Sequence, residues 1–174
     1  STEIIYFACQ AYLTKKSRVI IPHPTFSEYE RASAINGAKV IFYKLRESQD
    51  FQIEPKELIK LLIRHNPKIL FLCNPNNPTG QDLEENDVRE ILKASEKTLL
   101  VLDEAYVDFI RNTWDSSRYL GYKNLLILKS LTKTYGFAGL RIGYALADEE
   151  TVKILEKVRP PWNVNSIAQT AVLV

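Results

Sequence analysis

The chain has 174 residues, of which 45% are hydrophobic and 25% are charged, and its formal net charge is +2. These values are ordinary for a globular protein, and a chain of this length buries one core but is too short for two full domains. Lys and Arg are spread along the whole sequence, which argues against the basic face of a nucleic-acid-binding protein. The apolar runs are short, which argues against a membrane span.

The cysteine and histidine residues do not indicate a metal site, and we predict no metal. Cys9 and Cys73 stand far apart among apolar neighbours. We therefore expect buried free thiols in a reducing compartment, which favours a cytoplasmic location. His23 and His65 lack further ligand residues at a suitable spacing, and we expect them in loops or at helix ends.

Helical and extended patterns alternate along the chain. Apolar residues that recur at helical spacing predict helices, and short apolar runs predict strands. In chain order we expect helix 2–13, strand 18–22, helix 27–35, strand 39–43, a helix opened by Pro55, strand 69–73, helix 84–95, strand 99–103, strand 125–129, strand 142–146, helix 149–158 and a final helix over 166–174.

This alternation predicts an α/β fold, a doubly wound and mostly parallel sheet with helices on both faces. Four of the expected strands are nearly continuous apolar runs, as is typical of strands that are buried on both faces. In such sheets ligands bind beyond the carboxyl ends of the strands. The polar residues that follow each strand are therefore the candidates for a functional site.

Two polar clusters follow the strands 69–73 and 99–103. The segment Asn74–Gly80 holds two Asn-Pro pairs and predicts a rigid turn whose amides reach a ligand, although a plain structural turn explains it equally well. The segment Asp103–Tyr106 begins with a carboxylate at the mouth of the sheet. A buried anion there is expected to need a cationic partner, and the alternative is a simple helix or loop cap.

A third cluster, Ser130–Lys133, closes the strand 125–129, and Arg141 follows eight residues after Lys133. Hydroxyls and a guanidinium together suit a phosphate group, and a lysine amine that stays partly neutral forms imines. An isolated Ser-x-Thr-Lys is more often solvated surface. The spacing of the glycines after Lys133 matches no dinucleotide fingerprint, and the sequence holds no Walker-type loop.

Taken together, Asn-Pro-Asn-Asn-Pro-Thr-Gly at 74–80, Asp-Glu-Ala-Tyr at 103–106 and Ser-Leu-Thr-Lys-Thr-Tyr-Gly-Phe-Ala-Gly-Leu-Arg-Ile-Gly-Tyr at 130–144 resemble the signature of class I/II aminotransferase-like enzymes of fold type I. The resemblance covers essentially the whole chain. It implies that residues 1–174 are the large domain that binds pyridoxal 5′-phosphate, without the family's N-terminal arm and small C-terminal domain. It also implies a homodimer when the protein is full length.

The resemblance further implies a role for each matching residue. Lys133 matches the lysine that forms an imine with the cofactor, and Asp103 matches the acid that pairs with the protonated ring nitrogen. Tyr106 and Asn77 match the groups that bind the ring's phenolic oxygen, so the implied catalytic residues are Lys133, Asp103 and Tyr106. The other matches are the stacking aromatic, the phosphate ligands and the start of the phosphate-binding helix: Phe26; Ser130, Thr132 and Arg141; and Ser1 and Thr2.

Within the family, the sequence is similar to two enzymes that act on a small phosphorylated amino substrate. The first choice is the L-threonine-O-3-phosphate decarboxylase of cobalamin biosynthesis, favoured by Phe26, by Leu-Thr-Lys-Thr-Tyr at 131–135 and by Pro-Pro-Trp at 160–162. The alternative is histidinol-phosphate aminotransferase of histidine biosynthesis, and a broader amino-acid aminotransferase is the third choice. A domain that binds a phosphate ligand without catalysis remains a non-enzyme alternative.

Overall fold

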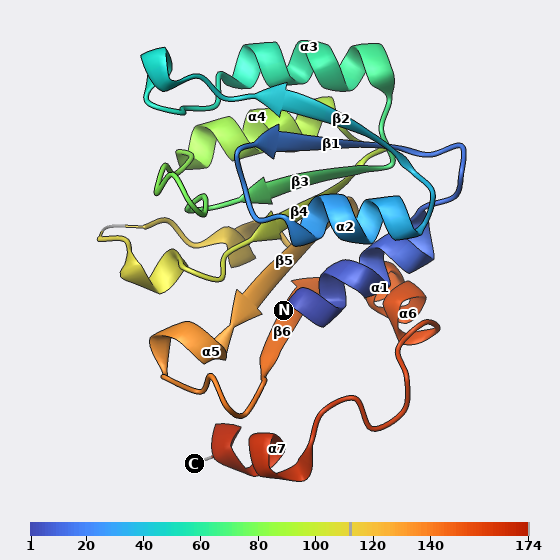
Figure 1. Cartoon of the computed structure of the whole chain (residues 1–174), viewed down its shortest axis with the longest axis vertical. Coiled ribbons are helices and arrows are strands. Elements are labelled where there is room, and N and C mark those ends of the chain that lie inside the picture. Colours follow the sequence, from blue (N-terminus) through green and yellow to red (C-terminus); the bar gives the residue numbers. More distant parts are fainter. Residues whose placement is uncertain (112, 174) are drawn as a thin grey trace.

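The computed structural model describes residues 1–111 and 113–173, which form one sheet with helices packed on both of its faces (Figure 1). Val174, the last residue of the expected final helix, lies outside this range. In chain order the elements are α1 Thr2–Tyr12, β1 Arg18–His23, α2 Glu28–Ile35, β2 Lys39–Lys44, η1 Glu47–Gln49, α3 Pro55–His65, β3 Ile69–Cys73, α4 Glu85–Ala94, β4 Leu99–Asp103, η2 Val107–Phe109, η3 Ser116–Tyr119, β5 Leu125–Ser130, α5 Leu131–Thr134, β6 Gly143–Ala147, α6 Glu149–Glu156 and α7 Ser166–Val172.

The sheet has six strands in the order β2-β1-β3-β4-β5-β6. All neighbouring strands are parallel except β6, which pairs with β5 in the antiparallel direction. The prediction of a doubly wound, mostly parallel α/β sheet is therefore confirmed. Because β6 runs the opposite way, its first residue, Gly143, lies beside the last residue of β5, Ser130.

The sheet is buried on both faces because successive residues of a strand point to opposite sides. On one side Val101 and Phe71 pack in a core with α1, α2 and α6. On the other side Leu100 and Leu70 pack in a second core with α3 and α4. This two-sided burial explains why the central strands are continuous apolar runs.

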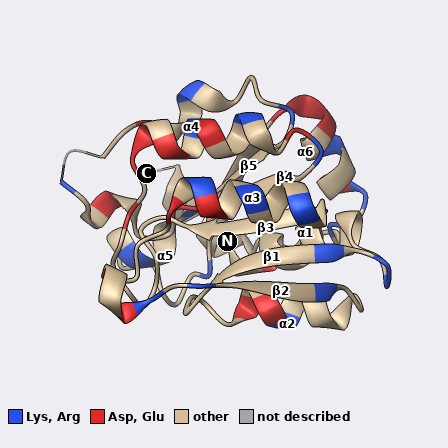
Figure 2. Cartoon of the chain, turned by 90° about the horizontal axis from the view of Figure 1, so that it is seen from above, with Lys and Arg blue, Asp and Glu red and all other residues tan. Residues whose placement is uncertain are grey.

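The outer surface carries charges of both signs. Figure 2 shows Lys and Arg interspersed with Asp and Glu on the exposed sides of α3 and α4. No helix within the described part of the chain is both long and apolar enough to cross a membrane.

Both cysteines are buried free thiols, as predicted. Burial raises the pKa of Cys9 to about 12 and that of Cys73 to about 11. His65 is the last residue of α3, as expected, whereas His23 ends strand β1 rather than lying in a loop.

We predict that Cys9 and Cys73 resist alkylation in the native protein. The reactive species is the thiolate, and burial keeps both groups protonated and shielded. Iodoacetamide labelling followed by peptide mass spectrometry should show slow modification of both residues in buffer and rapid modification in denaturing urea. Equal rates in the two solvents would contradict the burial of these side chains.

Candidate active site

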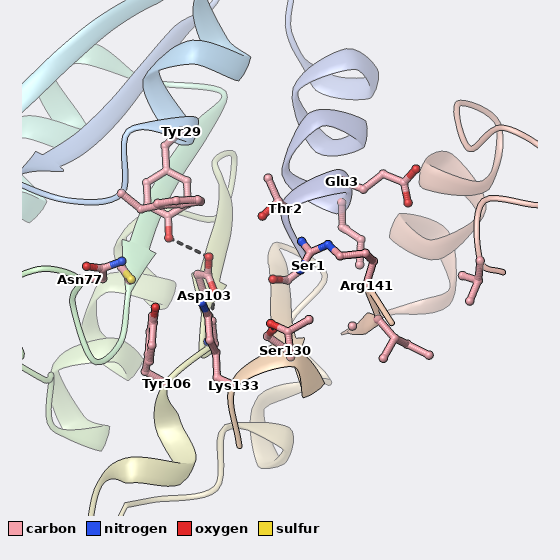
Figure 3. A pocket seen from close by; sticks show the side chains of 18 of the residues that line it. Ser1, Thr2, Glu3, Tyr29, Asn77, Asp103, Tyr106, Ser130, Lys133 and Arg141 are labelled. Atoms are coloured by element: carbon pink, nitrogen blue, oxygen red, sulfur yellow. Dashed lines mark hydrogen bonds between the residues drawn. The ribbon is translucent and has the colours of Figure 1, made fainter. Parts of the chain in front are cut away.

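A cavity of about 460 Å³ opens at the carboxyl ends of β1, β3, β4 and β5 (Figure 3). Every residue to which the sequence assigned a site role lines this cavity: Ser1, Thr2, Phe26, Asn77, Asp103, Tyr106, Ser130, Thr132, Lys133 and Arg141. The residues come from segments far apart in the sequence. They meet because parallel strands deliver their carboxyl ends to the same edge of the sheet.

Asp103 ends β4 and is the most deeply placed charged group of the cavity, with 4% of its surface exposed. Its Oδ2 accepts a hydrogen bond of 2.8 Å from the Tyr29 hydroxyl, and its Oδ1 accepts one of 3.1 Å from the Ala105 amide. Among the described residues, no ion pair includes Asp103. The sequence led us to expect a cationic partner for Asp103. The structure instead gives it two neutral donors, the Tyr29 hydroxyl and the Ala105 amide.

Burial raises the pKa of the Asp103 carboxyl above its ordinary value, and the hydrogen bonds from Tyr29 and Ala105 act in the opposite direction. A carboxylate in this setting is a strong acceptor, because it is short of hydrogen bonds compared with one in water. It suits a ligand that brings a proton on a ring nitrogen.

Lys133 and Tyr106 come from neighbouring strand ends and approach each other. The Lys133 Nζ lies 5.5 Å from the centre of the Tyr106 ring. Figure 3 shows the Tyr106 hydroxyl pointing up into the cavity, with Asn77 on the neighbouring loop and Asp103 between these residues and the start of α1. An amine, a phenol, an amide and a carboxylate therefore converge on one space.

The loop that carries Asn77 is fixed by its neighbour, the buried Asn76. The Asn76 Oδ1 accepts a hydrogen bond of 2.6 Å from Thr25, and its Nδ2 donates to the Pro24 carbonyl oxygen at 3.0 Å. These bonds join the loop after β3 to the loop after β1, which carries Phe26. The turn predicted from the Asn-Pro pairs is therefore hydrogen-bonded to the loop after β1, and these two loops form neighbouring walls of the cavity.

The other end of the cavity is rich in hydroxyls and cationic groups. Ser130 Oγ and Thr132 Oγ1 lie 2.8 Å apart, and Thr132 and Lys133 belong to the short helix α5. Arg141 has a positive φ of 55° and reaches the cavity from the loop before β6. The N-terminus of α1, with Ser1 and Thr2, completes this end, and a helix N-terminus favours anions.

Glu104 follows Asp103 but takes no part in the cavity. It is buried, and its Oε2 pairs with Lys129 Nζ at 2.5 Å and accepts a hydrogen bond of 2.9 Å from Ser116. Burial raises the pKa of the Glu104 carboxyl, and the bond to Lys129 opposes this rise. The pair joins the ends of β4 and β5, so it holds together the two strands that carry Asp103 and Ser130.

Sequence reasoning assigned no role to several residues of the cavity wall, among them Tyr29, Ala105 and Cys73. Cys73 faces Asp103 across the β3–β4 pair, a position that follows from the strand register. Tyr29 lies three residues after Phe26, and its amide donates to the Phe26 carbonyl oxygen at 3.4 Å, so the turn that leads into α2 places the two rings next to each other. A buried carboxylate needs hydrogen-bond donors. A search for a nearby hydroxyl that could donate to Asp103 would have identified Tyr29.

Comparison with known proteins agrees with this geometry. The family model described as aminotransferase class I and II matches residues 1–174. The chain belongs to this family. The resemblance of the sequence motifs to class I/II aminotransferases is thereby confirmed. Enzymes of the family depend on pyridoxal phosphate, act on amino-acid substrates and are typically dimeric.

Individual relatives carry two different names. The chain is 40% identical over 173 residues to a histidinol-phosphate aminotransferase of Thermoanaerobacter sp., covering 99% of this chain and 48% of that protein. A crystal structure of L-threonine-O-3-phosphate decarboxylase from Porphyromonas gingivalis is similar with a TM-score of 0.81 and 33% identity, covering 96% of this chain and 48% of that one.

A third relative was solved with the cofactor. It is the histidinol-phosphate aminotransferase of Sinorhizobium meliloti in complex with pyridoxal-5′-phosphate, with a TM-score of 0.87 and 25% identity over 95% of this chain and 45% of that one. The chain thus spans about half the length of the relatives it matches.

Proposed function

We propose that the protein containing this chain is a pyridoxal-phosphate-dependent aminotransferase and that its substrate is histidinol phosphate. The observation that carries the enzyme class is the meeting of Lys133, Asp103 and Tyr106 around one cavity at the mouth of the sheet. The choice of substrate is supported by the similarity to the Thermoanaerobacter histidinol-phosphate aminotransferase. In this proposal residues 1–174 form the cofactor-binding domain.

The donor set of the cavity fits the cofactor. A phosphate ester needs hydroxyls, backbone amides and a cation, and Ser130, Thr132 and Arg141 supply them together with the start of α1. An aldehyde needs an amine, which Lys133 provides, and a protonated ring nitrogen needs a carboxylate, which Asp103 provides. Phe26 offers an aromatic face in the same wall.

When bound, pyridoxal phosphate supplies an electron-withdrawing ring for a carbanion at the substrate carbon next to nitrogen. Asp103 would hold the proton on the ring nitrogen, which keeps that ring positively charged. Tyr106 and Asn77 would donate to the phenolic oxygen and fix the ring's orientation. Lys133, once its amine is free, would act as the general base and acid that moves a proton at the substrate carbon.

The decarboxylase is the second candidate, and it is supported by the similarity to the Porphyromonas gingivalis enzyme. The aromatic residues that favoured it in the sequence give it little further support. Phe26 lines the cavity, but Tyr135 and Trp162 do not, and these two side chains are 62% and 92% exposed. Because Tyr135 and Trp162 do not line the cavity, they do not favour one reaction over the other, so we rank the aminotransferase first.

We predict that the complete protein forms glutamate from 2-oxoglutarate with histidinol phosphate as the amino donor. Product analysis should show no turnover of histidinol phosphate without the keto acid, with the Lys133→Ala variant as the blank. Carbon dioxide release from threonine phosphate without 2-oxoglutarate would instead assign the decarboxylase. A protein that binds the cofactor but turns over neither substrate would refute both assignments.

We further propose a homodimer in the cytoplasm. Dimers are typical of the family, and the buried free thiols Cys9 and Cys73 suit a reducing compartment. Sedimentation of the complete protein tests the assembly directly.

A further inference from the structure

Tyr29 is the largest fully buried polar side chain near the cavity, with 1% of its surface exposed. It lies in the first turn of α2, and its ring stacks on Phe71 of β3 with centres 4.8 Å apart and planes at 11°. The ring of Phe26 meets it edge-on at 5.6 Å. These contacts leave the Tyr29 ring one orientation, so its hydroxyl has a fixed position.

That hydroxyl points at the Asp103 carboxylate, to which it donates at 2.8 Å (Figure 3). Burial raises the pKa of the Tyr29 hydroxyl well above its ordinary value, so Tyr29 remains protonated and acts as a donor. The second oxygen of Asp103 is held by the Ala105 amide. Both oxygens are thus anchored from the protein side, which leaves their remaining lone pairs for a ligand in the cavity.

We infer that Tyr29 is a positioning residue that keeps Asp103 ionised and aimed at the ring nitrogen of the bound cofactor. The inference rests on the proposed function for the identity of the ligand. The contact between Tyr29 and Asp103 does not, because it exists within the protein alone.

Tyr29 can keep Asp103 ionised without neutralising it because its hydroxyl is an uncharged donor. A cationic partner would compensate the charge of Asp103 and weaken its attraction for a protonated ring. A phenol stabilises the carboxylate by a hydrogen bond and leaves its net charge available. Without the phenol, the carboxylate would become more basic and would draw the proton away from the ring nitrogen.

Other titratable or charged groups line the same cavity as Asp103. They are the Cys73 thiol on β3, Tyr106 after β4, Lys133 after β5, Arg141 before β6 and Glu3 on α1. In the described part of the chain, none of these side chains forms a hydrogen bond or ion pair with Asp103. Tyr29 is therefore the side chain whose removal changes the carboxylate most directly.

The first test uses the complete protein without cofactor. Carbon-13 NMR of aspartate-labelled protein would follow the Asp103 carboxyl, whose signal is assigned by its loss in Asp103→Asn. Tyr29→Phe should raise the pKa of Asp103 by roughly one to two pH units, the value of a hydrogen bond to a charged group. The matched control is Tyr119→Phe, which removes a hydroxyl that donates to Glu85 at 2.9 Å elsewhere in the fold and should leave Asp103 unchanged.

The second test uses the protein loaded with nitrogen-15-labelled pyridoxal phosphate. In Tyr29→Phe the ring-nitrogen signal should move toward the unprotonated position, and kcat should fall about 10- to 100-fold with little change in KM. Tyr29→Phe added to Asp103→Asn should cause almost no further loss, because Tyr29 acts through Asp103. Additive losses in this double-mutant cycle would reassign Tyr29 to a structural role.

The outcomes separate this inference from the proposed function. An unchanged Asp103 pKa in cofactor-free Tyr29→Phe overturns the inference, whatever reaction the protein catalyses. A raised pKa in a protein that fails to bind the cofactor refutes the proposed function alone. If Tyr29→Phe does not fold, a ring-fluorinated tyrosine placed at position 29 is a stronger donor of nearly the same shape. It should lower the Asp103 pKa, and a pKa that stays the same or rises refutes the inference.

Discussion

Replacing Lys133 with alanine in the complete protein is expected to abolish covalent cofactor binding and to leave the fold intact. The Lys133 side chain is exposed and belongs to the four-residue helix α5, so its loss removes little packing. We expect the free energy of unfolding of the cofactor-free variant to stay within about 0.5 kcal/mol of the original protein. Turnover should fall on the order of 10²- to 10⁴-fold or more, since the group that transfers the proton is gone.

The measurement is borohydride reduction followed by peptide mass spectrometry. In the unmodified protein the reduced cofactor should be found on the peptide that contains Lys133, and in Lys133→Ala it should be absent. Lys93→Ala is the matched control, because Lys93 is exposed on α4 at a distance from the cavity. Cofactor still fixed in Lys133→Ala would make another lysine the anchor.

The same experiment decides between an enzyme and a passive binding domain. A domain that merely holds a phosphate ligand has no need of a covalent bond to an amine. Borohydride would then fix no cofactor in the unmodified protein, and the Lys133→Ala variant would behave in the same way. Loss of labelling confined to Lys133→Ala would exclude that alternative.

The sheet was predictable because its strands carry a strong and simple signal. The runs at Ile69–Cys73 and Leu99–Asp103 are buried at every position, and short apolar runs of this length are typical of strands that are covered on both faces. The ends of all six predicted strands lie within one residue of the observed ends. Turn residues and the first polar side chain mark those ends clearly.

The short helices were not predicted, since their residues show no periodicity long enough to recognise. The helices η2, η3 and α5 have three or four residues each, which is about one turn and too short to show an apolar stripe. The helix α5 nevertheless matters for the site, because it carries Thr132 and Lys133. Its position follows from the end of β5 and not from its own sequence.

The site was predictable where residues follow strand ends and was missed where a side chain reaches in from a helix. Asp103 is the last residue of β4, and Asn77 and Lys133 follow β3 and β5 within four residues, so the direction of the sheet brings them together. Tyr29 reaches Asp103 from α2 across 74 positions of sequence, and only tertiary packing establishes such a contact. For the same reason the sequence led us to expect a cation beside Asp103, where the fold provides a phenol.

Asp103→Asn is expected to impair catalysis far more than cofactor binding. The phosphate end of the cavity, with Arg141, Ser130 and Thr132, should supply most of the affinity because bonds to a phosphate dianion are charge-assisted. The neutral amide no longer holds a proton on the ring nitrogen, so kcat should fall on the order of 10²- to 10³-fold, whereas the cofactor dissociation constant should rise much less. Asp82→Asn, an exposed site away from the cavity, is the matched control.

The same substitution should stabilise the cofactor-free protein at neutral pH. Because burial raises the pKa of Asp103 in the folded state, the folded protein binds its proton more tightly than the unfolded chain does. The free energy of unfolding therefore falls as the pH rises from the pKa of Asp103 in the unfolded chain to its higher pKa in the folded protein. This loss of stability persists at neutral pH. Asparagine carries no charge, so denaturant unfolding of Asp103→Asn should show a higher midpoint than the original protein at neutral pH and a smaller difference in acid. A lower midpoint at neutral pH would mean that the bonds from Tyr29 and Ala105 outweigh the cost of burying the charge.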